Sequence, residues 1–234
     1  MNIIQKIWKY RKDFRSIFQS VYFNFHYLPF KQAIKLPILL YRPKLLVLKG
    51  TVKIVGGQIY YGMIRLGYPS VSLYPNNGIT IENHGGTILF NGDCVIGNNS
   101  YISIGPKGFV EFGNKFSAST TLRLASYDKI IFRDRVRLGW NTLIIDTDFH
   151  KLTKLSGGYS RGHAPVIIGS NNWFGNGCRM MKKTTTPDYC VIQGGATLSG
   201  PVDVPSYSVV GSDSKIVVKA TGLWRNVDDD IIEY

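Results

Sequence analysis

Several signatures of common catalytic and binding proteins are missing from this sequence of 234 residues. It has no phosphate-binding P-loop, no dinucleotide-binding glycine fingerprint and no nucleophile elbow, so those routes to nucleotide and hydrolase chemistry are excluded. It also lacks an H-x-x-x-H pair and any cysteine cluster, and we therefore expect no metal site. No groove-reading motif or aromatic sheet platform for nucleic acid is present, which argues against a nucleic-acid partner.

Cysteine is scarce, and the three residues, Cys94, Cys178 and Cys190, make an odd number. All three fall at the same small-residue position of the repeat described below, which predicts buried free thiols. Cys178 and Cys190 are 12 residues apart and are expected on different faces, so we predict no disulfide and no nucleophilic cysteine. Free thiols indicate a reducing, cytoplasmic compartment.

Acidic residues are nearly absent from residues 1–53, which hold eleven Lys or Arg against Asp13 alone, in a chain of formal net charge +13. A basic end suggests an anionic partner. The early charges also interrupt any secretory signal, and the uncharged run that follows is too short and too polar to span a bilayer. We therefore expect no signal peptide and no membrane crossing.

An amphipathic helix is predicted over residues 2–26, because apolar residues recur there at a spacing of three and four. Its apolar positions are Ile3, Ile4, Ile7, Trp8, Phe14, Ile17, Phe18, Val21, Tyr22 and Phe25. Such a helix would pack on the first coil of a solenoid as a cap. The alternative, which is compatible with the first, is a peripheral contact with the cytosolic face of a membrane.

A six-residue repeat is the main feature that is present, and it is clearest between Ile168 and Lys215. Apolar side chains occupy nearly every sixth position: Ile168, Phe174, Met180, Thr186, Ile192, Leu198, Val204 and Val210. A small or medium residue stands four positions later in each hexad: Asn172, Cys178, Thr184, Cys190, Ala196, Val202, Ser208 and Ser214. This period is typical of a hexapeptide β-helix, and we predict an all-β solenoid.

Three hexads make one triangular coil, so residues 18 apart should stack one inter-strand spacing, about 4.8 Å, from each other. The repeat begins imperfectly near Ile79, slips by two residues near Ile104 and is interrupted at residues 150–165. We divide the chain into a basic helix and lead-in (1–53), the repeat domain with its excursion (54–219) and a tail (220–234). Long irregular excursions from a repeat commonly carry function.

The rungs, the excursion that begins Asp-Thr-Asp-Phe-His at residues 146–150, the restart at residues 168–175 and the end of the repeat at residues 204–215 together resemble a hexapeptide-repeat acyltransferase. Within that superfamily the sequence is most similar to O-acetyltransferases of bacterial surface polysaccharides, with galactoside and maltose acetyltransferases as relatives. The resemblance covers residues 79–219. It implies a left-handed parallel β-helix, a homotrimer, acetyl-CoA as donor and active sites between neighbouring subunits.

His150 is the predicted catalytic base, because it stands where the family keeps its catalytic histidine. Acetyl transfer to a sugar hydroxyl requires a base for the hydroxyl proton, and imidazole titrates near neutrality. In an extended segment Asp146, Asp148 and His150 share one side, so that a carboxylate would orient the ring. Asn141 and His163 are predicted acceptor contacts. Position alone would favour the alternative, a surface-loop histidine bonded to backbone.

Donor binding follows from the resemblance at residues 193–200, which align with the family's Gly-Ala-Gly-Ser-Val-Val-Thr-Lys pattern. The predicted donor-binding residues are Trp173, Gly175, Gly195, Ala196, Ser199 and Lys215. Gly200 replaces the family's lysine, which leaves Lys215 to supply positive charge to the CoA phosphates. Gln193 replaces a corner glycine, and Asn172 occupies an inward position that is usually valine.

These features predict an acetyl-CoA-dependent O-acetyltransferase that acts on a sugar hydroxyl of a cell-surface polysaccharide or its precursor, by direct transfer in a ternary complex. One alternative is N-acetylation of an amino-sugar nucleotide, for which the same base would serve. Another is a non-catalytic, membrane-associated trimeric scaffold, which the departures at Gln193 and Gly200 would favour.

Overall fold

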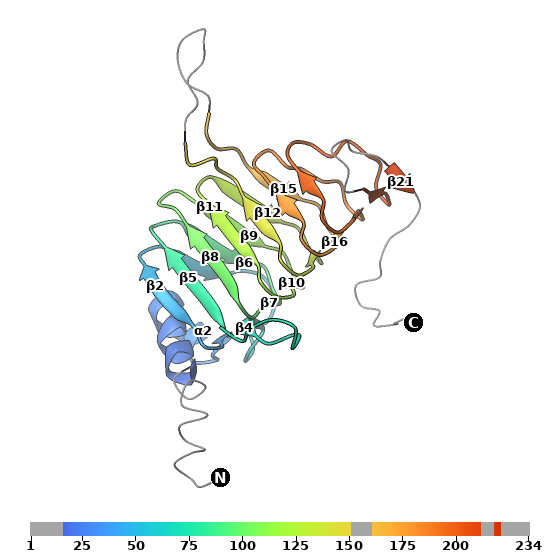
Figure 1. Ribbon diagram of the computed structural model, residues 1–234. Coiled ribbons are helices and arrows are strands. Elements are labelled where there is room, and N and C mark those ends of the chain that lie inside the picture. The colour runs from blue at the N-terminus through green and yellow to red at the C-terminus, as the bar shows by residue number, and fades with distance from the viewer. Residues whose placement is uncertain (1–15, 151–160, 212–217, 221–234) are drawn as a thin grey trace.

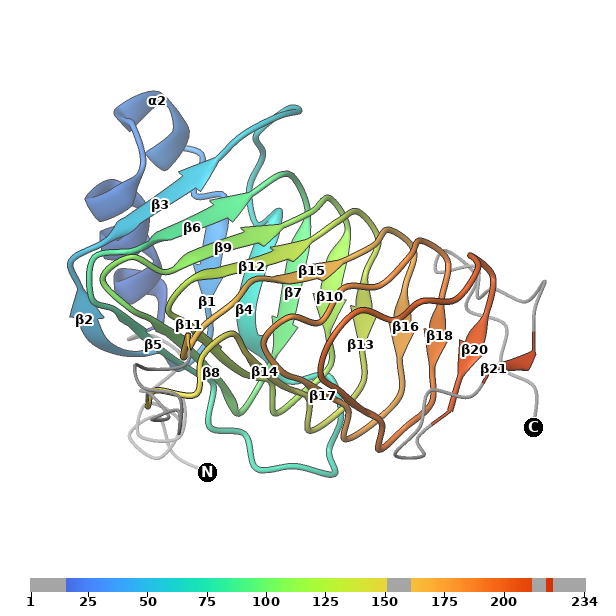
Figure 2. The same ribbon diagram turned by 90° about the horizontal axis from the view of Figure 1, so that it is seen from above.

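The chain winds into a parallel β-helix whose three sheets form the sides of a prism (Figures 1 and 2). The computed structural model describes residues 16–150, 161–211 and, for the backbone alone, 218–220. Sheet A consists of β1 (Ile38–Leu40), β4 (Ile64–Tyr68), β7 (Cys94–Gly97), β10 (Phe116–Ala118), β13 (Arg137–Leu138), β16 (Trp173–Phe174), β18 (Val191–Ile192), β20 (Val209–Val210) and β21 (Val218–Ala220).

Sheet B consists of β2 (Lys44–Leu48), β5 (Ile79–Asn83), β8 (Ser100–Ile104), β11 (Arg123–Ser126), β14 (Leu143–Ile145), β17 (Arg179–Met180) and β19 (Thr197–Leu198). Sheet C consists of β3 (Thr51–Ile54), β6 (Thr87–Phe90), β9 (Phe109–Phe112), β12 (Lys129–Phe132) and β15 (Val166–Ile168). Up to β15 the chain visits the sheets in the order A, B, C, so each of these coils has an AB corner, a BC corner and a CA corner. In the later coils isolated bridges at Thr185 and Pro201 continue the side of sheet C.

The predicted 18-residue coil is confirmed in the last part of the repeat, where Phe174 pairs with Ile192 and Ile192 with Val210. Earlier coils are longer, since Ile96 pairs with Ala118, 22 residues later. The extra residues lie in corners such as residues 105–108, which explains the slip in phase after Ile104. The period of six therefore describes the strands, while the length of the corners varies.

The core is a column of inward side chains that is continuous from coil to coil. In sheet C the rings of Phe90, Phe112 and Phe132 stack with centroids 5.3 and 5.6 Å apart, and Phe116 packs beside them. All four side chains are at most 2% exposed. Stacked aromatic side chains bury a large apolar area, so this column stabilises the middle coils.

A polar side of the N-terminal helix closes the first coil. Residues 16–27 are helical, and α2 (Phe30–Ala33) follows. The Ser20 hydroxyl accepts a hydrogen bond from the backbone N–H of Leu40 at 2.8 Å. The side-chain carbonyl of Asn24 accepts from the N–H of Ile38 at 3.1 Å, and its NH₂ donates to the C=O of Ile38 at 2.7 Å. These bonds satisfy the otherwise open edge of β1, so the described part of the helix is a cap.

One expectation for the N-terminal region, the start of the repeat domain at residue 54, differs from the structure. β1, β2 and β3 already belong to the three sheets, so the solenoid begins at Ile38 and not at residue 54. The helix packs through Ser16, Ser20 and Asn24 and through Phe23, which is 1% exposed, while Ile17, Phe18 and Tyr22 are 55–74% exposed. Among the described residues, no helix has the length and apolar character needed to span a membrane.

The prediction of buried free thiols is confirmed, since Cys94, Cys178 and Cys190 are unpaired and at most 1% exposed. Burial raises the pKa of each of the three thiols, which suppresses the reactive thiolate. We expect no reaction with an aromatic disulfide reagent in native buffer and three equivalents of reaction in denaturant, followed by absorbance. A native thiol that reacts within seconds would mean that a coil opens readily.

Candidate active site

The excursion leaves the BC corner as a short antiparallel ribbon. Thr147 pairs with His163 across it, and the N–H of Asp148 donates to the carbonyl of Gly162 at 2.7 Å. His150 follows two residues after Asp148 and is exposed. Residues 151–160 lie outside the described part of the chain. The predicted base therefore stands on the first arm of the ribbon, beyond the end of β14.

Asp146 anchors this ribbon to the preceding coil. Its carboxylate is 0% exposed and accepts hydrogen bonds from the Ser126 hydroxyl at 2.8 Å and from the N–H groups of Tyr127 and Asp128 at 2.7 and 3.0 Å. Burial raises the pKa of Asp146, and these three hydrogen bonds oppose that rise. Both carboxylate oxygens of Asp146 thus accept hydrogen bonds from the preceding coil. No described contact joins Asp146 to the ring of His150.

Replacing Asp146 by asparagine should lower the free energy of unfolding by about 1–3 kcal/mol, because the amide NH₂ would take the place of one oxygen and face the N–H donor of Tyr127 or that of Asp128. Asp148→Asn is the matched control, since it breaks only a partly exposed ion pair worth at most about 1 kcal/mol. Urea unfolding midpoints would measure both. An unchanged midpoint in Asp146→Asn, with activity lost, would instead support an orienting role toward His150.

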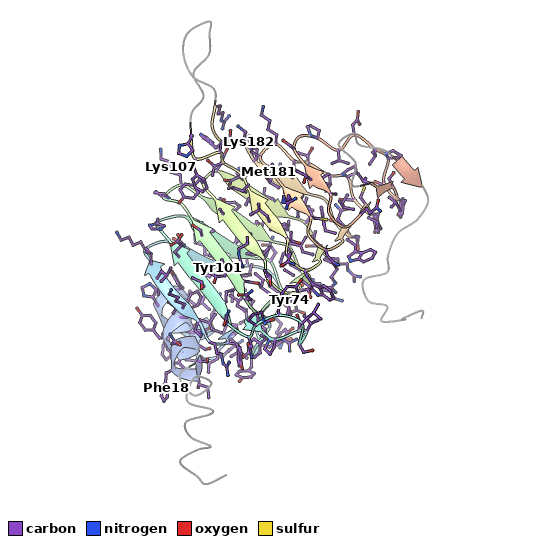
Figure 3. The ribbon with its side chains drawn as sticks, viewed as in Figure 1. Phe18, Tyr74, Tyr101, Lys107, Met181 and Lys182 are labelled. Atoms are coloured by element: carbon purple, nitrogen blue, oxygen red, sulfur yellow. The ribbon has the colours of Figure 1, made fainter. Side chains whose placement is uncertain are left out.

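Asp148 forms an ion pair with Lys182, which the next coil supplies just after β17. The Lys182 ammonium also donates to the carbonyl of Arg161 at 3.2 Å, so it bridges the two arms of the ribbon. Figure 3 places Lys182 beside the start of the excursion. Lys182 was not among the predicted site residues, because its 34-residue separation from Asp148 has no signature in a six-residue period.

His163, and not His150, has a ring that a carboxylate orients. Its Nδ1 lies 2.8 Å from Oδ2 of Asp128, and Arg161 approaches the same oxygen at 3.4 Å. A carboxylate only accepts hydrogen bonds, so Nδ1 carries the proton and Nε2 is left as an acceptor in the neutral ring. The His163 side chain is 48% exposed. His163 is therefore an oriented imidazole at the base of the ribbon.

Asn141 lies at the AB corner, away from the ribbon. Its amide donates to the hydroxyl of Tyr74 at 2.7 Å, and the ring of Tyr74 meets that of Trp140 edge to face with centroids 6.0 Å apart. Sheet B separates this corner from the BC corner, and Figure 3 shows Tyr74 and Lys182 on opposite sides of that sheet. Within one chain, Asn141 is therefore not brought to His150.

The predicted donor residues Gly195 and Ala196 also lie at the AB corner. The N–H of Gly195 donates to the carbonyl of Asn176 at 2.7 Å, and the N–H of Ala196 donates to that of Gln193 at 3.2 Å. Ala196 is buried, whereas Gly195 is exposed, and an added Cβ there would meet nothing within 4 Å. These N–H groups hold the coil together, so a donor would meet an open backbone surface here and not free N–H donors.

The remaining predicted donor residues are dispersed. Trp173 is 39% exposed on the outer face of sheet A, between Arg137 and Val191 of the adjacent strands. Gly175 is packed against the next coil, since a Cβ would lie 2.6 Å from the N atom of Gly194. Ser199 is exposed near the BC corner. Lys215 lies outside the described residues.

The site thus has two parts in each chain: a polar cluster with two histidines at the BC corner, and an open surface at the AB corner. Where the chain is described, no three His, Cys, Asp or Glu side chains come close enough to hold a metal ion. The chemistry available at the BC corner is proton transfer by imidazole, supported by carboxylates.

Superposition on a solved structure identifies the fold of the chain. The polySia-specific acetyltransferase NeuO superposes with a TM-score of 0.52 at 13% identity, over 83% of this chain and 92% of NeuO. The chain has the left-handed β-helix fold of the hexapeptide-repeat acetyltransferases. No protein-family model matches the sequence, and no curated protein matches it either.

Two further structures with the hexapeptide-repeat fold are more distant. The polysialic acid O-acetyltransferase OatWY has a TM-score of 0.39 and 15% identity, over 79% of this chain and 91% of OatWY. A hexapeptide-repeat acetyltransferase from Vibrio cholerae, in complex with acetyl-CoA, has a TM-score of 0.35 and 14% identity, over 55% of this chain and 64% of its own. The superposition on NeuO confirms the fold expected from the sequence.

Proposed function

We propose that the protein is an acetyl-CoA-dependent O-acetyltransferase that acts on a sugar hydroxyl of a cell-surface polysaccharide or its precursor. The observation that carries the proposal is the BC corner, where His150 and His163 stand on a ribbon that Asp146 and Lys182 fasten to the coils on either side. The fold shared with NeuO, a polySia-specific acetyltransferase, supports the same class of reaction.

In the proposed mechanism, a ring nitrogen of His150, Nε2 or Nδ1, takes the proton of the acceptor hydroxyl. The hydroxyl oxygen of the sugar attacks the thioester carbonyl of acetyl-CoA at the same time. The tetrahedral intermediate collapses with loss of the CoA thiolate, which receives the proton, so the products are an acetyl ester and free CoA. No acyl-enzyme is needed, because the three cysteines are buried. Positioning of the two substrates supplies much of the rate enhancement.

We further propose that the complete site forms in a homotrimer. Within one chain, sheet B separates the open surface at Gly195 from the ribbon that bears His150. A donor bound along the AB corner of one subunit would reach a base at the BC corner of another, as the acyltransferase resemblance implies. The monomer would then bind acetyl-CoA weakly and transfer the acetyl group poorly.

Release of free CoA from acetyl-CoA, with transfer of labelled acetyl to an oligosaccharide, would test the function. An oligomer of sialic acid is a suitable first acceptor, because it is the chemistry named for NeuO. The product should be an ester that mild base removes, whereas transfer to an amino-sugar nucleotide would give an alkali-stable amide. Absence of acetyl-CoA binding by calorimetry would contradict both enzymatic functions and favour a scaffold.

A further inference from the structure

The outer side of the N-terminal cap is an exposed apolar surface. Its large side chains are between 46 and 74% exposed: Ile17, Phe18, Tyr22, Phe25, Phe30, Ile34 and Leu46. They come from the helix over residues 16–27, from the segment that contains α2 and from β2. Figure 3 shows Phe18 on the outer side of the cap, away from the coils. We call these seven residues the cap surface.

The cap surface is exposed for a structural reason. Ser16, Ser20 and Asn24 stand at i, i+4 and i+8 on the helix, and their side chains bond the backbone of Arg42, Leu40 and Ile38. This polar stripe must face β1, because the first coil has no other strand to pair its edge. Ile17, Phe18, Tyr22 and Phe25 of the same helix are thereby turned outward, while Phe23 packs in the core.

The charges around the cap surface are of one sign. Residues 16–81 contain seven Lys or Arg and no Asp or Glu. Five lysines among them are exposed: Lys31, Lys35, Lys44, Lys49 and Lys53. A second copy of the chain would bring a like charge to this surface. Residues 1–15, with five more Lys or Arg and one Asp, would do the same. An anionic surface with an apolar interior is complementary to it.

We propose that the cap surface docks the protein on the surface of an anionic lipid bilayer. The aromatic and aliphatic side chains of the helix enter the boundary between headgroups and acyl chains, and the surrounding lysines contact anionic headgroups. The prism then stands on the membrane by its N-terminal end. This surface is independent of the BC corner, so the proposal does not depend on the catalytic assignment.

Sedimentation of the full chain with vesicles tests the proposal. We expect binding to phosphatidylcholine vesicles that contain 30% phosphatidylglycerol, and binding at least about tenfold weaker to phosphatidylcholine alone. The double variant Phe18→Ser/Tyr22→Ser should bind the anionic vesicles at least about tenfold more weakly. Lys31→Gln/Lys49→Gln should lose most of the preference for anionic lipid. Leu73→Ser, which alters another exposed apolar residue far along the chain, should bind like the wild type.

Three results would overturn the proposal. The first is no binding of the wild type to anionic vesicles. The second is wild-type binding by Phe18→Ser/Tyr22→Ser with an unchanged melting temperature, which would assign the contact to other residues. The third is a higher oligomer in solution that this variant dissociates, which would make the cap surface a contact between copies of the chain.

Discussion

Replacing His150 by alanine is expected to lower kcat for acetyl transfer by at least about two orders of magnitude, because the acceptor hydroxyl would lose its general base. The KM for acetyl-CoA should change little, since His150 is assigned to proton transfer and not to donor binding. The side chain is exposed, so the variant should fold with an unchanged melting temperature. Steady-state release of CoA at saturating acceptor measures the effect.

Two other histidines make the result interpretable. His84→Ala is the matched control, because His84 is an exposed residue of an early coil that lies 3.7 Å from Glu82 and should not affect kcat. His163→Ala should raise the KM for the acceptor if His163 is an acceptor contact, as the sequence predicts. If kcat falls in His163→Ala and not in His150→Ala, the base is the imidazole that Asp128 orients.

The period of six was sufficient to predict the solenoid, because each hexad encodes one strand and one corner locally. It did not predict the first coil, since β1, β2 and β3 contain no clear hexad and pair only through contacts distant in sequence. The packing of the N-terminal cap likewise depends on contacts between residues that are distant in sequence. A helical pattern identifies an apolar stripe, but whether that stripe faces the protein depends on what β1 needs at its open edge.

The excursion was found from sequence because it interrupts a regular pattern. Its contacts were not, since they join residues on different coils whose corners vary in length. Asp146 is 18 residues from Asp128 and binds its N–H, whereas Asp128 is 35 residues from His163 and binds its ring. The alternation of side chains along an extended strand predicted that Asp146 and His150 lie on the same side. In the structure the carboxylate of Asp146 instead bonds Ser126 and Tyr127 of the preceding coil.

Asn172 should be the most costly polar side chain to remove from the core, although valine is the usual residue at its position in the resembling family. It is 0% exposed and sits between two coils. Its amide NH₂ donates to Thr186 Oγ1 at 2.7 Å and to the carbonyls of Pro187 and Gly169 at 2.9 and 3.1 Å. Its carbonyl accepts from the N–H of Cys190 at 2.5 Å.

Asn172→Val nearly preserves volume but leaves the N–H of Cys190 and two carbonyls buried without this partner. We expect the free energy of unfolding to fall by about 3 kcal/mol, since each unsatisfied buried group costs about 1–3 kcal/mol. Asn176→Ala, an exposed change on the same coil, should shift the urea midpoint little. A midpoint that is unchanged or raised in Asn172→Val would mean that the CA corner closes without the amide. The hydrogen bonds of Asn172 would then specify the path of the corner and not the stability of the coil.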